Sequence, residues 1–499
     1  MTLLRRVLLT ALGLFLASVP FACSLARRGP MPRVVASAPA EPSPAGTSGE
    51  SYQHLPDSPF LATAESPVST FGVDVDTASY ANIRRYLVDG QLPPADAVRI
   101  EELVNYFHYL LPEPEGDQAV AVVSEVNACP WAPAHRLLRI GLKARTLARE
   151  QRPPRNLTFL IDVSGSMDSP RKLPLLKRAL GLLADGLDER DRVSIVVYAG
   201  AEGLALPPTP GSERARLRAA LQSLEAGGST NGGAGLVLAY RVNAEAATPG
   251  SSNRVILATD GDFNVGVTSP EELLRLIEER RRTGTFLTVL GFGMGNLKDA
   301  TLEMLADKGN GNYAYIDSYA EARKVLVEDV GGTLVTVARD VKVQVELDRA
   351  AVESYRLVGY ENRRLEQRDF EDDRADAGEM GAGHTVTALY ELVPRPGAAG
   401  TLGTIKVRYQ APDTDGSRLV GAPVRDDGQA LEMASPDFRF AAGVAAFGLV
   451  LRNSPWKGEA SLTLARSLAD PAASDEHRRE FLALVDRAGQ LEKSRSSRP

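Results

Sequence analysis

The chain has 499 residues, a length that predicts about three domains of ordinary globular size. Hydrophobic residues make up 43% and charged residues 24%, which excludes a largely disordered, collagen-like or multi-spanning protein. With 57 basic against 64 acidic residues the formal net charge is −7, so we expect no nucleic acid among the partners.

The first residues follow the order of a secretory signal. Two arginines precede the uncharged stretch 7–22, and Cys23 comes next. A membrane-spanning helix needs about 20 apolar residues, so this shorter stretch predicts a signal peptide over 1–23 and export from the cytosol. The segment ending at Cys23 resembles a bacterial lipoprotein box, although Pro20 stands where that box usually has Leu. The resemblance implies a lipidated Cys23 that anchors the chain to a membrane.

Residues 24–67 are rich in Pro, Ser, Ala and Gly and have almost no apolar periodicity. This composition predicts a flexible linker. Cleavage before Cys23 would leave Cys129 as the one remaining cysteine with a free side chain, so we expect no internal disulfide. We interpret Cys129 as a small buried apolar residue rather than a reactive thiol.

An N-terminal flanking domain is predicted over 68–150. Its elements follow from short β-rich runs and two helix-like segments. The predicted strands are Phe71–Val75, Val120–Asn127 and Leu137–Lys143, and the predicted helices are Asp76–Val88 and Asp96–Phe107.

Residues 154–330 alternate β-rich apolar runs with segments of helical period. This alternation predicts an α/β unit, a doubly wound, mostly parallel sheet with helices on both faces. The predicted strands are Leu157–Asp162, Arg192–Tyr198, Arg254–Thr259, Phe286–Gly291 and Asn312–Ile316, with Gly203–Leu206 at the edge. The predicted helices are Lys172–Leu187, Glu213–Leu224, Gly233–Ala246, Pro270–Thr283, Asp299–Asp307 and Ala320–Val330.

A β-rich domain is predicted over 334–425 and a helical segment over 434–493. Since neither flank looks self-sufficient, we expect their strands to form one β-sandwich into which the α/β unit is inserted. The uncharged run Phe440–Leu451 is too short to span a membrane and predicts a buried helix. The predicted strands of the second flank are Val341–Leu347, Ser354–Gly359, Thr385–Val393 and Gly403–Gln410.

Polar side chains gather at the ends of strands in the α/β unit. Asp162, Ser164 and Ser166 follow the first strand, Thr230 precedes a helix, and Asp260 follows the strand that ends at Thr259. The carboxyl ends of parallel strands are where loops converge and ligands bind. Oxygen-only ligands suit a hard cation, and a small octahedral site favours Mg²⁺, with Mn²⁺ or Ca²⁺ as alternatives.

This spacing, D-x-S-x-S with a distant Thr and a distant Asp, resembles the metal-ion-dependent adhesion site of von Willebrand factor type A domains. The resemblance implies that Ser164 and Ser166 bind the cation directly and Thr230 directly or through water. It implies that Asp162 and Asp260 act mostly through water and the serine hydroxyls. It also implies that the ion accepts an Asp or Glu carboxylate from a partner protein.

Other interpretations exist for single loops, because Ser and Asp are common caps at helix starts. Asp168 and Asp262 lie beside the motif and either tune it or are solvated loop acids.

A wider stretch, 69–394, resembles bacterial exported von Willebrand factor type A proteins. The segments that carry the wider resemblance are Phe71–Tyr80, Cys129–Trp131, Gly227–Gly233, Gly291–Asn296 and Gly309–Tyr315.

The leading hypothesis is a non-catalytic, cation-dependent adhesion or scaffold module at the cell envelope. A metal-dependent hydrolase is the alternative, but no His, Lys or Cys near the three loops is apparent as a base. A scaffold with a purely structural metal is the third hypothesis.

The run from Asp74 to Ala78 resembles the D-x-D-x-T of haloacid dehalogenase phosphatases. Ala78 stands where that motif has Thr, and we interpret Asp76 as a helix cap.

Overall fold

The computed structural model describes residues 49–229, 232–261, 263, 269–295, 297–329, 334–412 and 416–496. Cys23, Thr230 and Asp262, together with the predicted signal and residues 24–48 of the predicted linker, lie outside the described residues. The predictions made for them are therefore not tested by the fold.

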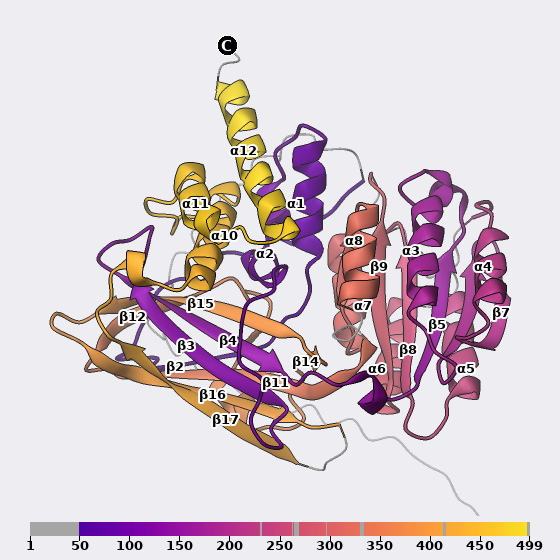
Figure 1. Ribbon diagram of the computed structural model, residues 1–499, viewed down its shortest axis with the longest axis horizontal. Helices are drawn as coiled ribbons and strands as arrows, with labels where there is room; N and C mark the ends of the chain where they lie inside the picture. Colours follow the sequence, from indigo (N-terminus) through magenta and orange to yellow (C-terminus); the bar gives the residue numbers. More distant parts are fainter. Residues whose placement is uncertain are drawn as a thin grey trace, which may run out of the picture. The chain divides into compact units, whose positions relative to one another are not determined.

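The α/β unit is built on a six-stranded sheet of order β10-β9-β8-β5-β6-β7 (Figure 1). All neighbouring strands are parallel except the β6–β7 pair, which is antiparallel, so the predicted mostly parallel sheet is confirmed. The strands are β5 (Arg155–Asp162), β6 (Arg192–Tyr198), β7 (Glu202–Pro210), β8 (Ser252–Thr259), β9 (Thr285–Phe292) and β10 (Tyr313–Ile316).

Helices cover both faces of this sheet, as the alternating pattern predicts. The core on one face joins leucines of α3 and α4 to β5 residues such as Phe159, and the core on the other face joins α5, α6 and α7 to Leu160. The predicted last helix is α8 followed directly by the π-helical turn Lys324–Glu328. The helices are α3 (Leu173–Asp185), α4 (Arg214–Gln222), α5 (Gly232–Ala246), α6 (Pro270–Arg282), α7 (Asp299–Lys308) and α8 (Tyr319–Arg323).

The two flanks share a pair of antiparallel sheets, of order β1-β12-β15-β4-β3 and β13-β2-β11-β16-β17, with β14 paired to β11. Strand β4 from the first flank pairs with β15 from the second, and β2 pairs with β11, which confirms the insertion of the α/β unit. The strands before the insertion are β1 (Leu61–Ala62), β2 (Val68–Gly72), β3 (Val120–Ala128) and β4 (Arg136–Ala144). Those after it are β11 (Thr336–Leu347), β12 (Val352–Val358), β13 (Arg364–Leu365), β14 (Gly378–Gly381), β15 (Thr385–Pro394), β16 (Gly400–Gln410) and β17 (Ser417–Asp426).

Several details of the strand predictions were wrong, and the short strands β1, β13 and β14 were not predicted. The strand expected at Phe71–Val75 is β2, which starts earlier and ends at Gly72, before the acidic turn. Strand β17 was not predicted, because Gly421 and Pro423 interrupt its pattern. Its place at the end of the sheet order makes the proline tolerable, since an edge strand needs fewer backbone donors.

A helical layer packs against the first of these sheets. Its core joins side chains of α1, α2, α10, α11 and α12 to Leu137 and Leu389, and Cys129 lies buried within it. Helix α10 is almost wholly buried, which confirms the interpretation of Phe440–Leu451. Within the described ranges, no helix combines the length and apolarity needed to cross a membrane. The helices are α1 (Ala78–Val88), α2 (Ile100–Asn105), α10 (Pro436–Leu451), α11 (Leu462–Ala469) and α12 (Glu476–Ser496).

Candidate functional site

Two of the predicted acidic residues lie at neighbouring strand ends. Asp162 is the last residue of β5, and Asp260 directly follows β8. These strands pair in parallel with Ile161 opposite Ala258, so both carboxylates reach the same edge of the sheet. Both residues are fully buried. The fold thus brings together the residues that the sequence placed on separate strands.

The two serines follow Asp162 in a tight turn. The hydroxyl oxygens of Ser164 and Ser166 lie 3.1 Å apart, and the Ser164 amide donates to Oδ1 of Asp162 at 2.9 Å. Ser164 is buried, whereas Ser166 is exposed. The turn therefore presents one hydroxyl to the interior and one to solvent, side by side.

The loop that leads to Thr230 lies against this turn. The Gly227 amide donates to the Val163 carbonyl at 2.7 Å, and the Gly165 amide donates to the Gly228 carbonyl at 3.1 Å. Ser229 ends the described part of the loop. Two backbone hydrogen bonds thus hold the start of the loop beside the serines.

Hydrogen bonds fix the Asp162 carboxylate. Its Oδ2 accepts from the Tyr198 hydroxyl at 3.2 Å and from the Thr259 hydroxyl at 3.3 Å. Burial raises the pKa of Asp162 above its ordinary value, against the hydrogen bonds from Ser164, and the charge of Asp260 adds to the rise. Two buried carboxylates so close together favour a cation at this edge.

A lysine that sequence reasoning missed lies at the same edge. The Lys172 ammonium donates to Oδ2 of Asp260 at 2.7 Å, and the lysine side chain is only 9% exposed. The expectation that no Lys lies near these loops was wrong, because the turn closed by the bond from the Lys172 amide to the Ser169 carbonyl brings residue 172 back to the edge. We call Asp162, Ser164, Ser166, Asp260 and Lys172 the serine edge.

The hydroxyl and carboxylate oxygens of the serine edge are suitable ligands for a small hard cation. Ligands about 2.1 Å from Mg²⁺ in an octahedron lie about 3 Å from their neighbours, which matches the 3.1 Å between the hydroxyls of Ser164 and Ser166. Hydroxyl and carboxylate oxygens are also the ligand types that Mg²⁺ prefers. The described donors therefore fit the expected ion, with Thr230 as a further candidate outside the described residues.

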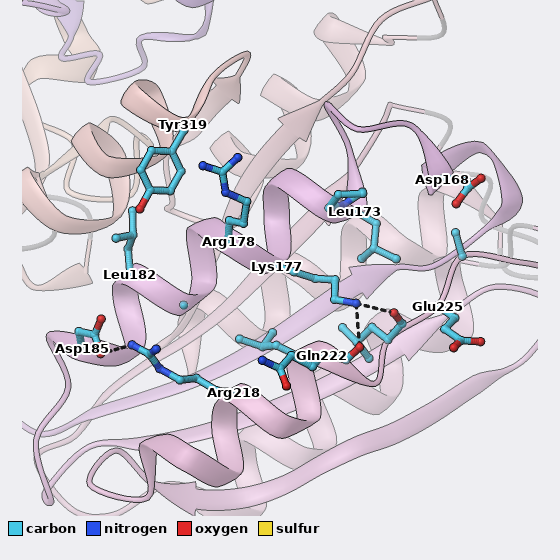
Figure 2. A pocket seen from close by; sticks show the side chains of 15 residues that line it. Asp168, Leu173, Lys177, Arg178, Leu182, Asp185, Arg218, Gln222, Glu225 and Tyr319 are labelled. Carbon is cyan, nitrogen blue, oxygen red and sulfur yellow. Dashed lines mark hydrogen bonds and ion pairs between the residues drawn. The ribbon is translucent and has the colours of Figure 1, made fainter.

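A groove of 880 Å³ begins beside the serine edge at Asp168 and runs between α3 and α4 (Figure 2). Its cations already have partners. Lys177 donates to the carbonyls of Gln222 and Leu224 at 2.8 Å, and Arg218 pairs with Asp185 at 2.5 Å. The Arg178 guanidinium lies over the Tyr319 ring, 4.5 Å from the ring centroid. Asp168 is an exposed loop acid. The groove offers an extended surface next to the edge rather than a second charged site.

The motif that resembles phosphatases has a structural arrangement. The Arg363 guanidinium pairs with Asp74 at 3.3 Å, with Asp76 at 3.5 Å and with Asp307 at 2.6 Å. We call these four residues the Arg363 cluster. The sequence suggested that Asp76 caps α1, and this interpretation was wrong. Oδ1 of Asp76 instead accepts a hydrogen bond from the Tyr313 amide at 2.7 Å. Its carboxylate ties the start of α1 to the α/β unit.

Comparison with known proteins identifies relatives. A model of the von Willebrand factor type A domain matches residues 156–328, a model described as von Willebrand factor matches 46–139, and one described as "Uncharacterized protein YfbK, C-terminal" matches 332–402 and 395–491. The Escherichia coli protein YfbK is 40% identical over 466 residues, which cover 88% of this chain and 80% of YfbK.

Two further similarities are more distant. Human inter-alpha-trypsin inhibitor heavy chain H4 is 33% identical over 161 residues, which are 31% of this chain and 17% of that protein. A solved von Willebrand factor type A structure from Catenulispora acidiphila is 19% identical, with a TM-score of 0.44, and the match covers 74% of this chain and 90% of that one.

Proposed function

Because this chain belongs to the family of von Willebrand factor type A domain proteins that includes YfbK, we propose that it is a non-catalytic module that binds a partner protein through a divalent cation. Domains of this type often bind divalent cations and often serve as protein-binding modules. The observation that carries the proposal is the meeting of Asp162, Ser164, Ser166 and Asp260 at one edge of the sheet.

In this proposal Ser164, Ser166 and Thr230 hold Mg²⁺, and Asp162 and Asp260 support it through water and the hydroxyls. When bound, the ion supplies a Lewis-acidic position for a carboxylate oxygen of an Asp or Glu on the partner. Since neutral hydroxyls provide much of the ligand set, little of the positive charge is neutralised by the protein. The exposed Ser166 lies on the side from which a partner could approach.

The proposal is tested with the partner captured from native envelopes in Mg²⁺ and in EDTA. Asp162→Ala and Thr230→Ala should each abolish Mg²⁺-dependent capture while circular dichroism shows an unchanged fold. Asp185→Ala, an exposed acid at the far end of the groove, serves as the control and should leave capture intact. Undiminished capture in EDTA would contradict the proposal.

Two other functions remain as outcomes of related measurements. A metal-dependent hydrolase would need a base, and the ammonium of Lys172 is already paired with Asp260. Hydrolysis of a phosphoester or peptide that disappears in Asp162→Ala would favour that function. For a scaffold with a purely structural metal, Mg²⁺ would raise the melting temperature strongly and no partner would be captured.

We also propose that the chain is exported and held at a membrane through lipid on Cys23. The support is the sequence order of a charged segment, an apolar stretch and a cysteine. Metabolic labelling with a radioactive fatty acid should mark the wild-type chain and not Cys23→Ala. Labelling of both chains, or of neither, would contradict the anchor.

A further inference from the structure

The Lys172 side chain is built into the serine edge. Its ammonium lies 2.7 Å from Oδ2 of Asp260, and that carboxylate is completely buried. The residue is the N-cap of α3, directly before Leu173, and the Leu176 amide donates to its carbonyl at 2.9 Å. A long flexible side chain is thereby held at a fixed place inside the protein.

Gly293 provides the space for this lysine. Its φ is +76°, and a Cβ atom added there would lie 2.1 Å from Cε of Lys172 and 2.6 Å from Cγ. The Tyr315 hydroxyl donates to the Gly293 carbonyl and holds this backbone from the other side. Any other residue at 293 would displace the lysine stem, so the packing at the end of β9 is shaped around Lys172.

The position of this charge has consequences for a bound cation. Asp162 and Asp260 together carry two negative charges, and the ammonium cancels one of them within hydrogen-bond distance. A fixed positive charge a few ångströms from a divalent ion repels it, and the repulsion is strong in a buried setting. The same charge leaves less of the ion's own charge neutralised by the protein.

We propose that Lys172 is an internal counter-charge that weakens cation binding at the serine edge and so leaves the bound ion more electrophilic toward a partner's carboxylate. This inference rests on the metal site of the proposed function. Gly293 acts in it as a positioning residue, because its missing side chain admits the lysine stem.

The test is titration of the full chain with Mn²⁺ alone, followed by electron paramagnetic resonance, without any partner. Lys172→Met removes the charge and should bind Mn²⁺ at least about tenfold more tightly than wild type. Lys172→Gln removes the charge but keeps a hydrogen-bond donor toward Asp260, and should show the same tightening. Gly293→Ala should change affinity in the same direction by displacing the stem. Lys177→Met, at a position of α3 five residues further along the chain, is the matched control and should not change Mn²⁺ affinity.

The outcomes separate this inference from the proposed function. Tighter binding in both Lys172 variants supports the counter-charge, and if Lys172→Met does not fold, Lys172→Gln decides alone. Unchanged or weaker Mn²⁺ binding in Lys172→Gln overturns the counter-charge but leaves the metal site standing. If Mn²⁺ binding weakens in Lys172→Met but is unchanged in Lys172→Gln, the lysine serves only to orient Asp260. This result also overturns the counter-charge. Absence of Mn²⁺ binding in wild type and in every variant overturns both proposals.

Discussion

The serine edge and the Arg363 cluster are both acidic groups with one basic residue, yet they differ in what their oxygens do. In the Arg363 cluster one guanidinium meets three carboxylates, and a backbone amide takes a further oxygen of Asp76. At the serine edge the ammonium of Lys172 meets one carboxylate, while the hydroxyls of Ser164 and Ser166 contact each other.

This difference separates a structural cluster from a binding site. In the first, the described oxygens are used to join the α/β unit to the sandwich strands. In the second, two hydroxyl oxygens keep lone pairs that a cation could use. A group of acids in a sequence therefore does not indicate a ligand until the partners of each oxygen are known.

The largest effect is expected when the Arg363 cluster loses its cation. Arg363→Met leaves Asp74, Asp76 and Asp307 close together without the guanidinium. Breaking a buried ion pair by removing one partner costs about 3–5 kcal/mol of stability. Urea unfolding should show a loss of this size.

The neighbouring Arg364 provides the matched control, because it is exposed. Arg364→Met should change the free energy of unfolding by less than about 0.5 kcal/mol. If the two variants proved equally stable, the Arg363 cluster would not be the structural element described here, and the comparison with the serine edge would lose its basis.

A buried acid facing this cluster predicts a pH dependence. Glu101 is 1% exposed and neither carboxylate oxygen has a hydrogen-bond partner. Burial raises its pKa from 4.5 to about 8, with Glu361 and Asp74 adding to the rise. The folded state thus binds the carboxyl proton of Glu101 more tightly than the unfolded state does. The stabilisation from this proton is fully present below pH 4.5 and is lost as pH rises through about 8.

Glu101→Gln mimics the protonated acid at every pH. The variant should match wild type in thermal unfolding at pH 5 and exceed it at pH 9. Glu432→Gln, at an exposed position, should follow wild type throughout. A stability difference that stays constant between pH 5 and pH 9 would show that Glu101 does not titrate in this range.

Much of the fold follows from the sequence because its signals are local. The runs that form β5, β6 and β8 are apolar and β-branched, and the helices between them have a clear period, so their order and type were predictable. Asp162 and Asp260 were predictable for the same reason, since each stands at the end of a buried strand. The sandwich required pairing between strands on either side of the insertion, which only the apparent insufficiency of each flank indicated.

What the sequence did not reveal depends on long-range packing. Lys172 comes close to Asp260 only because a turn precedes α3 and because Gly293 leaves room for the lysine stem. The role of Asp76 was mistaken because its acceptor contact is to Tyr313, far along the chain. The sequence did contain one signal: Lys172 stands at the start of a predicted helix and shortly after the D-x-S-x-S motif. This position could have indicated a lysine close to the acidic residues of the edge.

A smaller effect is expected at the serine edge when one hydroxyl is removed. Ser166 is exposed, so Ser166→Ala should leave the fold unchanged, while Mn²⁺ affinity falls at least about 100-fold, because a lost ligand costs more than a lost supporting contact. Ser169→Ala removes a hydroxyl from another exposed position of the same loop and should bind Mn²⁺ like wild type. Equal affinities in the two variants would exclude Ser166 as a ligand.

The smallest effect is expected from the hydroxyl groups that orient Asp162. Tyr198→Phe removes one donor to Oδ2, while Thr259 and the Ser164 amide still hold the carboxylate. We expect Mn²⁺ affinity to fall about tenfold, the low end of the range for supporting contacts around a metal site, because the two remaining donors still orient the carboxylate. Tyr240→Phe, whose buried hydroxyl has no hydrogen-bond partner, is the matched control and should not change affinity. A loss in Tyr198→Phe as large as that in Ser166→Ala would mean that orientation of Asp162, rather than the pair of hydroxyls, determines cation binding at this edge.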